Sequence, residues 1–320
     1  MFNNFLNGEE INGLFFADCP FCGGQMVCNE REFVCYDCGE HGDIADFLAK
    51  KNRVSKTTAR WQLNHESNKD LFYVLEKACE YYSSRLNFEN AYLVKRGITE
   101  ETAKVYRLGW ADGNLIKFLE NEGIELLTAQ RAGLIKLKGN TYRDVFYKRL
   151  MFPIFNRQGK IIGFGGRIIE QSDAPKYLNS PETKIFQKKE CLFGVQNLDI
   201  KKPVYLVEGY MDALTLQSYG INAVAALGTA VGSGHAHLLR SLKVKNIILS
   251  LDGDNAGVKN ALKGLTALKE FNVQILCNYG ECKDPDEFIR KNGKEAFELL
   301  PLLSVEKFKL KSGVNPVDIL

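Results

Sequence analysis

Carboxylates follow three short apolar segments in the second half of the chain. Each segment has the length and β-branched content of a buried strand. Carboxylates that converge repel one another at neutral pH, and a bound divalent cation removes that repulsion. Because oxygen ligands favour Mg²⁺ or Mn²⁺, the pattern predicts a site for one of these ions. The candidate metal ligands are Glu208, Asp252, Asp254, Asp284 and Asp286.

Helical spacing alternates with these strands between residues 203 and 290. Strands alternating with helices predict a mostly parallel sheet with right-handed crossovers, whose ligand site lies beyond the carboxyl ends of the strands. Two cations about 4 Å apart at that edge would suit in-line attack on a phosphoryl group. Taken singly, Asp-Gly-Asp could be a surface turn and Glu208 a helix cap, but carboxylates at three strand ends favour the metal site. We expect strands over 204–207, 223–226, 247–251 and 273–276, and helices over 211–218, 235–242 and 256–268.

Five of the nine cysteines lie within residues 19–38. Four of them form two C-x₂-C pairs separated by twelve residues, which is the spacing of a tetrahedral zinc site. We expect a zinc ribbon with one structural zinc ion and a β-hairpin over 25–34, and we expect Cys28 not to be a ligand. A zinc module with a purely structural role is the alternative. The expected ligands are Cys19, Cys22, Cys35 and Cys38.

Several longer motifs extend this interpretation. EGYMDALTL, VAALGTA, SLDGDNAG and KDPDEF resemble the Toprim domain of DnaG-type primases. Upstream, YLVKRGIT, RLMFPIFNRQGKIIGFGGR and PKYLNSPET are similar to the polymerase core of that family, and the cysteine segment resembles its zinc-binding domain. The resemblance implies an RNA polymerase that starts short primers de novo on single-stranded DNA. It also implies that the zinc module recognises a short template sequence.

The resemblance also implies roles for individual residues. Glu208, Asp252 and Asp254 would be catalytic, with Glu208 binding metal or acting as acid or base and Asp212 supporting the metal shell. The implied partners are a single-stranded DNA template, ribonucleoside triphosphates and an RNA primer–template hybrid, with a replicative helicase as a further candidate. The positions that would line the groove and nucleotide site are Arg96, Arg149, Arg167, Lys176, Tyr177, Asn179 and Lys188.

The chain departs from the family pattern in two places. Cys22 stands where the family usually has histidine, and four-cysteine sites occur in phage primases, which favours a phage origin. Val145 and Tyr147 stand where the family tends to carry basic residues, so we expect a weaker phosphate contact there.

The length of 320 residues suits several domains, and we expect a multidomain α+β protein. A flexible linker is expected where the sequence is polar and lacks periodicity. The expected divisions are a zinc ribbon over 1–55, the linker over 56–69, a mixed α/β basic subdomain over 70–200, a Toprim domain over 201–290 and a short helical tail over 291–320.

Charge is distributed unevenly, although the net charge is only +3. Residues 131–190 contain thirteen Lys or Arg against five Asp or Glu, which suits a surface that contacts a polyanion. The sequence shows no apolar run long enough to span a bilayer and no signal peptide at its start. We therefore expect a cytoplasmic protein with no membrane partner.

Two other classes of protein contain Toprim domains. Topoisomerases and nucleases cleave DNA, and a topoisomerase needs a strand-gating domain for which the chain has no room. A non-catalytic zinc and Toprim protein of recombination or repair would need no segment such as RLMFPIFNRQGKIIGFGGR. That segment favours a primase over the binding protein.

Overall fold

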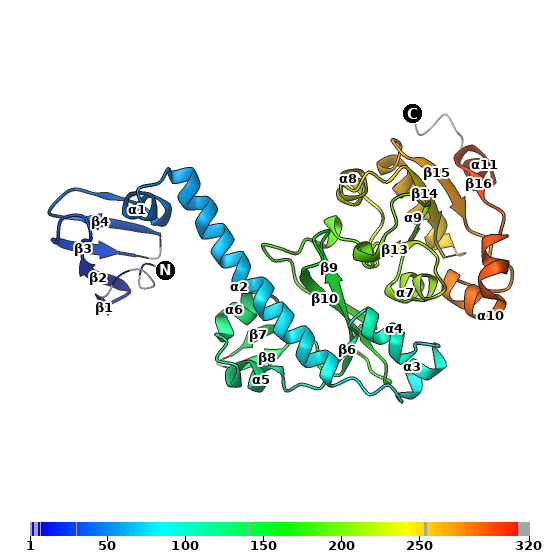
Figure 1. The fold of residues 1–320 in the computed structure, drawn as a ribbon, viewed down its shortest axis with the longest axis horizontal. Helices are drawn as coiled ribbons and strands as arrows, with labels where there is room; N and C mark the ends of the chain where they lie inside the picture. The colour runs from blue at the N-terminus through cyan, green and yellow to red at the C-terminus, as the bar shows by residue number, and fades with distance from the viewer. Residues whose placement is uncertain are drawn as a thin grey trace. The chain divides into compact units, whose positions relative to one another are not determined.

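The computed structural model describes residues 2, 6, 8–29, 31–139, 141–252 and 255–312 (Figure 1). The chain divides into two compact units, residues 1–70 and 71–320. In the part of the chain that the structure describes, no helix is both long and apolar enough to cross a membrane.

The first unit is an antiparallel sheet followed by a short helix, α1 (Ile44–Lys51). The predicted hairpin is confirmed, since β3 and β4 pair with Val27 opposite Val34. Asp43 caps α1 by accepting a hydrogen bond from the backbone N–H of Asp46 at 2.9 Å. The five strands, in spatial order, are β1 (Gly8–Ile11), β2 (Leu14–Asp18), β3 (Gln25–Cys28), β4 (Glu32–Cys35) and β5 (His41–Asp43).

Helix α2 runs from Lys56 to Ser84. A flexible linker without regular structure was predicted over 56–69. That prediction is wrong, because these residues are helical. Farther along the helix, Leu71, Val74 and Ala78 form an apolar stripe and are buried.

The first part of the second unit has a four-stranded antiparallel sheet in the order β11–β10–β9–β6 and a separate pair, β7–β8. Strands β9 and β10 form a hairpin and pair across a turn in which the N–H of Asn156 donates to the carbonyl of Lys160. The strands are β6 (Gly109–Ala111), β7 (Ile135–Lys138), β8 (Thr141–Asp144), β9 (Arg149–Phe155), β10 (Ile161–Ile168) and β11 (Tyr177–Asn179). The helices are α3 (Ala91–Lys95), α4 (Glu100–Val105), α5 (Leu115–Asn121) and α6 (Leu126–Arg131), with 3₁₀ turns η2 (Lys188–Glu190) and η3 (Val195–Asn197).

The second part contains the predicted parallel sheet, in the order β13–β12–β14–β15–β16. All seven strands and helices predicted between 203 and 290 are confirmed within a few residues. The strands are β12 (Val204–Val207), β13 (Ala223–Ala225), β14 (Asn246–Ser250), β15 (Asn272–Leu276) and β16 (Leu303–Ser304), the last antiparallel to β15. The helices are α7 (Tyr210–Ser218), α8 (Ser233–Ser241), α9 (Asn255–Ala267), α10 (Pro285–Glu298) and α11 (Val305–Lys311).

The segment expected to be a helical tail is partly a strand, because β16 extends the sheet before α11 begins. Helix α10 also continues beyond residue 290, to Glu298. The finer division into domains stays a prediction.

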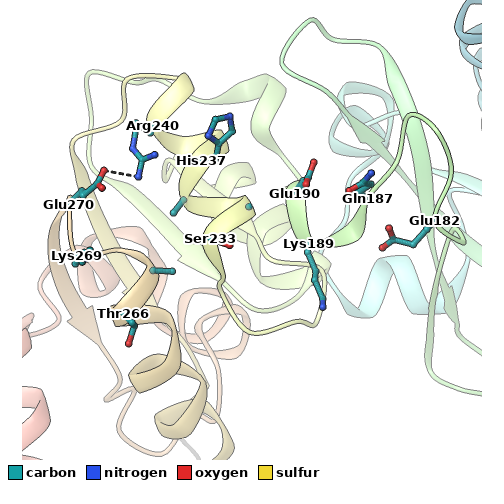
Figure 2. Close-up of a pocket in the computed structure, with 13 residues that line it drawn as sticks. Glu182, Gln187, Lys189, Glu190, Ser233, His237, Arg240, Thr266, Lys269 and Glu270 are labelled. Carbon is teal, nitrogen blue, oxygen red and sulfur yellow. Dashed lines mark ion pairs between the residues drawn. The ribbon is translucent and has the colours of Figure 1, made fainter. Parts of the chain in front are cut away.

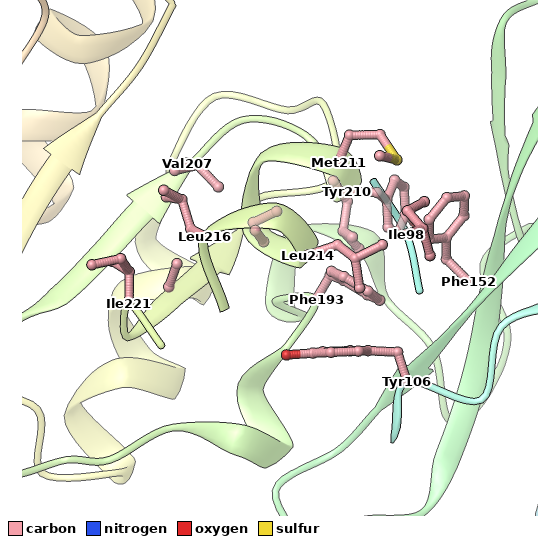
Figure 3. Packing of buried hydrophobic residues seen from close by; sticks show 14 of the residues in the cluster. Ile98, Tyr106, Phe152, Phe193, Val207, Tyr210, Met211, Leu214, Leu216 and Ile221 are labelled. Atoms are coloured by element: carbon pink, nitrogen blue, oxygen red, sulfur yellow. The ribbon is translucent and has the colours of Figure 1, made fainter. Parts of the chain in front are cut away.

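Two hydrophobic clusters lie on the two faces of the parallel sheet and show which helices cover each face. Side chains on successive residues of a strand point to opposite faces, and here Ile248 joins one cluster while Leu249 joins the other. Helices α7 and α10 contribute to the first cluster, and α8 and α9 to the second. The first cluster also contains Phe152 of β9, so it joins the two parts of the second unit around Phe193 and Tyr210 (Figure 3).

Candidate active site

The two cysteine pairs of the first unit meet. The Sγ atoms of Cys19, Cys22, Cys35 and Cys38 all lie within 4.8 Å of one another. Cys28 is buried in the hydrophobic core of the unit and is outside this group. Four thiolates at this spacing form a donor set that binds zinc.

The backbone around the cysteines turns toward the sulfur atoms. Gly23 and Gly39, which follow the two pairs, have φ values of +79° and +74°, a region that glycine adopts without strain. The N–H of Gly24 donates to the Sγ of Cys22 at 3.4 Å. The backbone N–H of Cys38 lowers the pKa of Cys35 to about 7, which favours the thiolate form at this one position, whereas burial raises the pKa of Cys19.

The predicted carboxylates lie at the carboxyl ends of the parallel strands. Glu208 follows β12 and is half-buried, and the side-chain amide of Asn260 donates to it at 3.4 Å. Asp252 is two residues beyond the end of β14. Asp284 caps α10 by accepting from the N–H of Glu287 at 2.7 Å. Asp254 lies outside the described residues.

Asp252 and Asp284 line one cavity, and their charges act on Asp212. Removal from solvent raises the pKa of Asp212 well above its usual range, and the charges of Asp284, Asp252 and Asp286 raise it further. The N–H of Gly209 donates to Asp212 at 3.2 Å and opposes the shift. A proton or a cation is therefore needed to offset the negative charge gathered here.

Asp286 has a different environment from the other carboxylates. It is 2% exposed and forms ion pairs with Arg96 at 2.5 Å and with Arg290 at 2.9 Å. The hydroxyl of Thr215 donates to its other oxygen at 2.6 Å. Two guanidinium groups and a hydroxyl thus surround the carboxylate, and its predicted role as a metal ligand stays a prediction.

Basic side chains border the carboxylates. Partial burial lowers the pKa of Lys176, and the charges of Arg167, Arg96 and Lys283 lower it further, whereas Asp284 raises it. Arg167 is 6% exposed and lies between the rings of Tyr92 and Tyr177, with its guanidinium 4.8 Å and 5.0 Å from the two ring centroids. Positive charge of this kind, next to a carboxylate edge, can hold a phosphate.

Four other predicted groove residues have internal partners. Arg149 is buried and donates to the backbone carbonyls of Gly166 and Lys176. The hydroxyl of Tyr177 accepts from Arg167. Asn179 accepts from the hydroxyl of Tyr210 and donates to the carbonyl of Leu227. Lys188 lies in η2, where its backbone N–H donates to Glu182.

A cavity of about 290 Å³ lies beside the carboxylates and is lined by Asp252, Tyr279, Lys283 and Asp284 among others. A larger one, of about 670 Å³, lies over α8 and contains none of the predicted site residues (Figure 2). Its charged lining is partly neutralised by an ion pair at 2.6 Å between Arg240 and Glu270. Because the smaller cavity is lined by Asp252 and Asp284, it is the candidate active-site cavity.

Known proteins resemble this chain over nearly its whole length. A family model for the N-terminal domain of the DNA primase catalytic core matches residues 78–199, and a Toprim-like model matches 205–289. The DNA primase of Aquifex aeolicus is 34% identical over 96% of this chain and 67% of its own length. The chain belongs to the DnaG-type DNA primase family.

Other members of the primase family agree with this assignment. The DNA primase of Clostridium acetobutylicum is 38% identical over 98% of this chain and 57% of its own length. A crystal structure of the zinc-binding and RNA polymerase domains of the Aquifex aeolicus primase has a TM-score of 0.67 at 30% identity, covering 94% of this chain and 82% of that one. A DnaG catalytic domain bound to single-stranded DNA has a TM-score of 0.68 at 32% identity, covering 78% of this chain and 83% of that one. The chain thus spans 57% and 67% of the two curated primases.

Sequence reasoning missed several side chains around the primase-like carboxylates. Arg290 could have been found, because it lies four residues after Asp286 on the same helix. Lys283 could also have been found, because it directly precedes Asp284 in the KDPDEF motif. Thr215 had no such signal, since tertiary packing brings it to Asp286. Asn260 and Tyr279 lie on α9 and on the β15–α10 loop, and the sequence marked neither.

Proposed function

We propose that this chain is a DNA primase, which synthesises short RNA primers de novo on single-stranded DNA. The observation that carries the proposal is the adjacency of two clusters of opposite charge. Burial and the charges of Asp284, Asp252 and Asp286, which follow two neighbouring strands, raise the pKa of Asp212. Partial burial and the basic cluster of Arg167, Arg96 and Lys283 lower the pKa of Lys176, which is also close to Asp284. A nucleotidyl transferase needs this arrangement, because it must hold cations and a triphosphate side by side.

The proposed reaction joins two ribonucleotides. The 3′-oxygen of one attacks the α-phosphorus of the next, a new P–O bond forms, the bond to the β-phosphate oxygen breaks, and pyrophosphate leaves. Mg²⁺ or Mn²⁺, when bound, would neutralise the carboxylates and polarise the α-phosphate. Glu208, Asp252 and Asp284 are the residues that would hold these ions, with Asp254 as a further ligand and Asp212 as their support.

The basic residues would orient the triphosphate and the template. Arg167 offers a guanidinium held between two aromatic rings, so little side-chain entropy is lost when it binds phosphate. Lys176, with a lowered pKa, would add a point charge beside it. Holding both reactants in line supplies much of the rate acceleration in such a reaction.

We assign one structural zinc ion to the four cysteines, and to the zinc ribbon a role in template recognition and initiation. The DNA-bound relative supports single-stranded DNA as the template. A replicative helicase is a further partner that we propose from family membership alone. The cytoplasm is the compartment in which such a replication protein acts.

The proposal is tested by primer synthesis on circular single-stranded DNA. The reaction contains labelled ribonucleotides, no added primer, and Mg²⁺ or Mn²⁺. Asp252→Asn removes a proposed metal ligand, and Asp173→Asn, at an exposed position outside the site, is the matched control. We expect short labelled oligoribonucleotides from the wild type and from Asp173→Asn but not from Asp252→Asn. DNA binding by Asp252→Asn should persist.

Two results would contradict the proposal. Synthesis that persists in Asp252→Asn would place the active site elsewhere. DNA binding without synthesis, with either cation and across varied templates, would favour a non-catalytic binding protein.

A further inference from the structure

One buried hydrogen bond joins the end of β14, two residues before Asp252, to the loop that leads to Asp284. Ser250 is the last residue of β14, and Tyr279 lies in the loop after β15. Their hydroxyl oxygens are 2.8 Å apart, and both side chains are buried. We propose that Tyr279 and Ser250 are positioning residues, whose hydrogen bond fixes the spacing of the two carboxylates for divalent cations. This inference rests on the metal-binding role proposed above.

The directions of the hydrogen bonds follow from a second contact. The hydroxyl of Tyr279 also lies 3.2 Å from the carbonyl oxygen of Leu276, which can only accept. Tyr279 therefore donates to Leu276 and accepts from Ser250. Each hydroxyl proton then has an acceptor, and this removes the cost of burying the two groups.

The phenol of Tyr279 is neutral and close to the acidic cluster. Burial raises its pKa well above the usual range, and the charges of Asp212 and Asp252 raise it further. A neutral phenol adds no charge to the site. Its contribution is therefore geometric.

The loop between β15 and α10 is built around this tyrosine. The N–H of Cys282 donates to the carbonyl of Tyr279 at 3.1 Å, and the N–H of Gly280 donates to the side chain of Asn278 at 3.0 Å. The ring of Tyr279 also packs against Phe288 of α10, with centroids 6.4 Å apart. Fixing the ring thus fixes the beginning of α10, where Asp284 lies.

The two strands end level, because Ser250 of β14 lies opposite Leu276 of β15. The cavity of about 290 Å³ beyond these strand ends is lined by Asp252, Tyr279 and Asp284. Before a cation binds, repulsion between the carboxylates acts to separate the loops. A hydrogen bond across the loops resists this separation and prepares the site for the cation.

The inference is tested by direct binding of Mn²⁺ to the zinc-loaded full chain, measured from the electron paramagnetic resonance signal of the free ion. Tyr279→Phe removes only the phenol oxygen, and Ser250→Ala removes its partner. We expect each change to raise the Kd for Mn²⁺ about fivefold, as for the loss of one buried hydrogen bond. The double variant should bind no more weakly than either single variant, because both remove the same interaction.

Tyr106→Phe is the matched control. Its hydroxyl donates to Gln217 at 2.5 Å within the same hydrophobic cluster, and no predicted metal ligand takes part in that bond. The control should leave the Kd within about twofold of the wild type, a change smaller than one hydrogen bond. Asp252→Asn defines background binding.

Three results would overturn the inference: an unchanged Kd in Tyr279→Phe, an equal loss in Tyr106→Phe, or no Mn²⁺ binding by the wild type above the Asp252→Asn background. Primer synthesis is measured in parallel. Wild-type protein that binds Mn²⁺ but makes no primers would contradict the proposed polymerase activity, while the Kd values would still decide the inference.

Discussion

At the scale of single residues, Asp212 is a carboxylate whose protonation depends on its surroundings. Its pKa is raised by burial and by three other aspartates, so the folded protein binds a proton that the unfolded chain releases more easily. Stability should therefore fall as pH rises from the usual aspartate pKa through the raised value. This effect belongs to the protein without divalent cations at the carboxylates, because a cation would replace the proton.

Asp212→Asn should remove this penalty. In buffer free of Mg²⁺ and Mn²⁺, with zinc retained, we expect the variant to melt at least about 2 °C above the wild type at pH 8. Near pH 4, where the wild-type carboxyl is protonated in the folded state and only about half ionised in the unfolded chain, the difference should be small. Thermal melts followed by circular dichroism measure both. An equal difference at the two pH values would show that a cause other than ionisation is responsible.

Arg167 carries a second prediction at the residue scale. It is buried against two tyrosines, and no carboxylate in the described part of the chain forms an ion pair with it. A buried guanidinium without an anionic partner can gain substantially from binding phosphate. Arg167→Lys keeps the charge but loses the planar donors, and we expect it to weaken ribonucleoside triphosphate binding about tenfold.

Equilibrium titration with a fluorescent, non-hydrolysable nucleotide measures this change. Arg157→Lys, in the exposed turn between β9 and β10, is the control and should bind as the wild type does. Equal affinities for the wild type and Arg167→Lys would mean that Arg167 is structural.

At the scale of elements, Asp286 connects three helices. It lies at the start of α10, pairs with Arg96 at the end of α3, and accepts from Thr215 of α7. Removing its charge would leave Arg96 and Arg290 partly buried without an anion. Since both arginines keep some exposure, we expect Asp286→Asn to cost about 2–3 kcal/mol in the free energy of unfolding, below the full cost of breaking a buried pair.

Urea denaturation of Asp286→Asn, Arg96→Gln and the double variant measures this cost and the coupling between the two residues. Asp173→Asn is the control and should change stability by less than about 0.5 kcal/mol. A metal ligand would behave differently. If the Asp286→Asn variant kept full stability but lost Mn²⁺ binding, Asp286 would be a metal ligand and not a structural ion-pair partner.

The sequence predicted the strands and helices between residues 203 and 276 because the local signals agree there. Short apolar strands alternate with segments of helical spacing, and the resulting parallel sheet has to bring Glu208, Asp252 and Asp284 to one edge. The beginning of α2 was missed for a physical reason. Residues 56–69 are polar on most positions, so they form a helix without the apolar stripe that periodicity can detect.

The sequence predicted which carboxylates lie close together. It did not predict which other side chains each carboxylate contacts. The pairing of Asp286 with Arg96 joins residues 190 positions apart. The bond between Ser250 and Tyr279 joins two uncharged side chains that carry no motif. Such contacts follow from tertiary packing, and a single sequence holds no local signal for them.

At the scale of the whole molecule, the two units carry opposite net charge. Residues 1–70 contain seven Lys or Arg and eleven Asp or Glu, whereas residues 71–320 contain thirty-five and twenty-eight. A zinc ion bound by four thiolates adds two further negative charges to the first unit. Contacts of the first unit with DNA therefore gain little from neutralising phosphates, and the salt dependence of binding should come from the second unit.

This separation predicts that zinc and salt act independently. Removing zinc, by Cys35→Ser or by a chelator, should abolish initiation if the zinc ribbon helps to start primers. The slope of the logarithm of DNA affinity against the logarithm of salt concentration should change by less than about one, because few phosphate contacts are lost.

Fluorescence anisotropy with a single-stranded oligonucleotide at several salt concentrations measures the slope. Lys176→Gln, beside the basic cluster, should reduce the magnitude of the slope by about one, and this variant tests whether the assay detects the loss of a single phosphate contact. If zinc removal reduced the magnitude of the slope by two or more, the first unit would have to bind the DNA backbone despite its net negative charge.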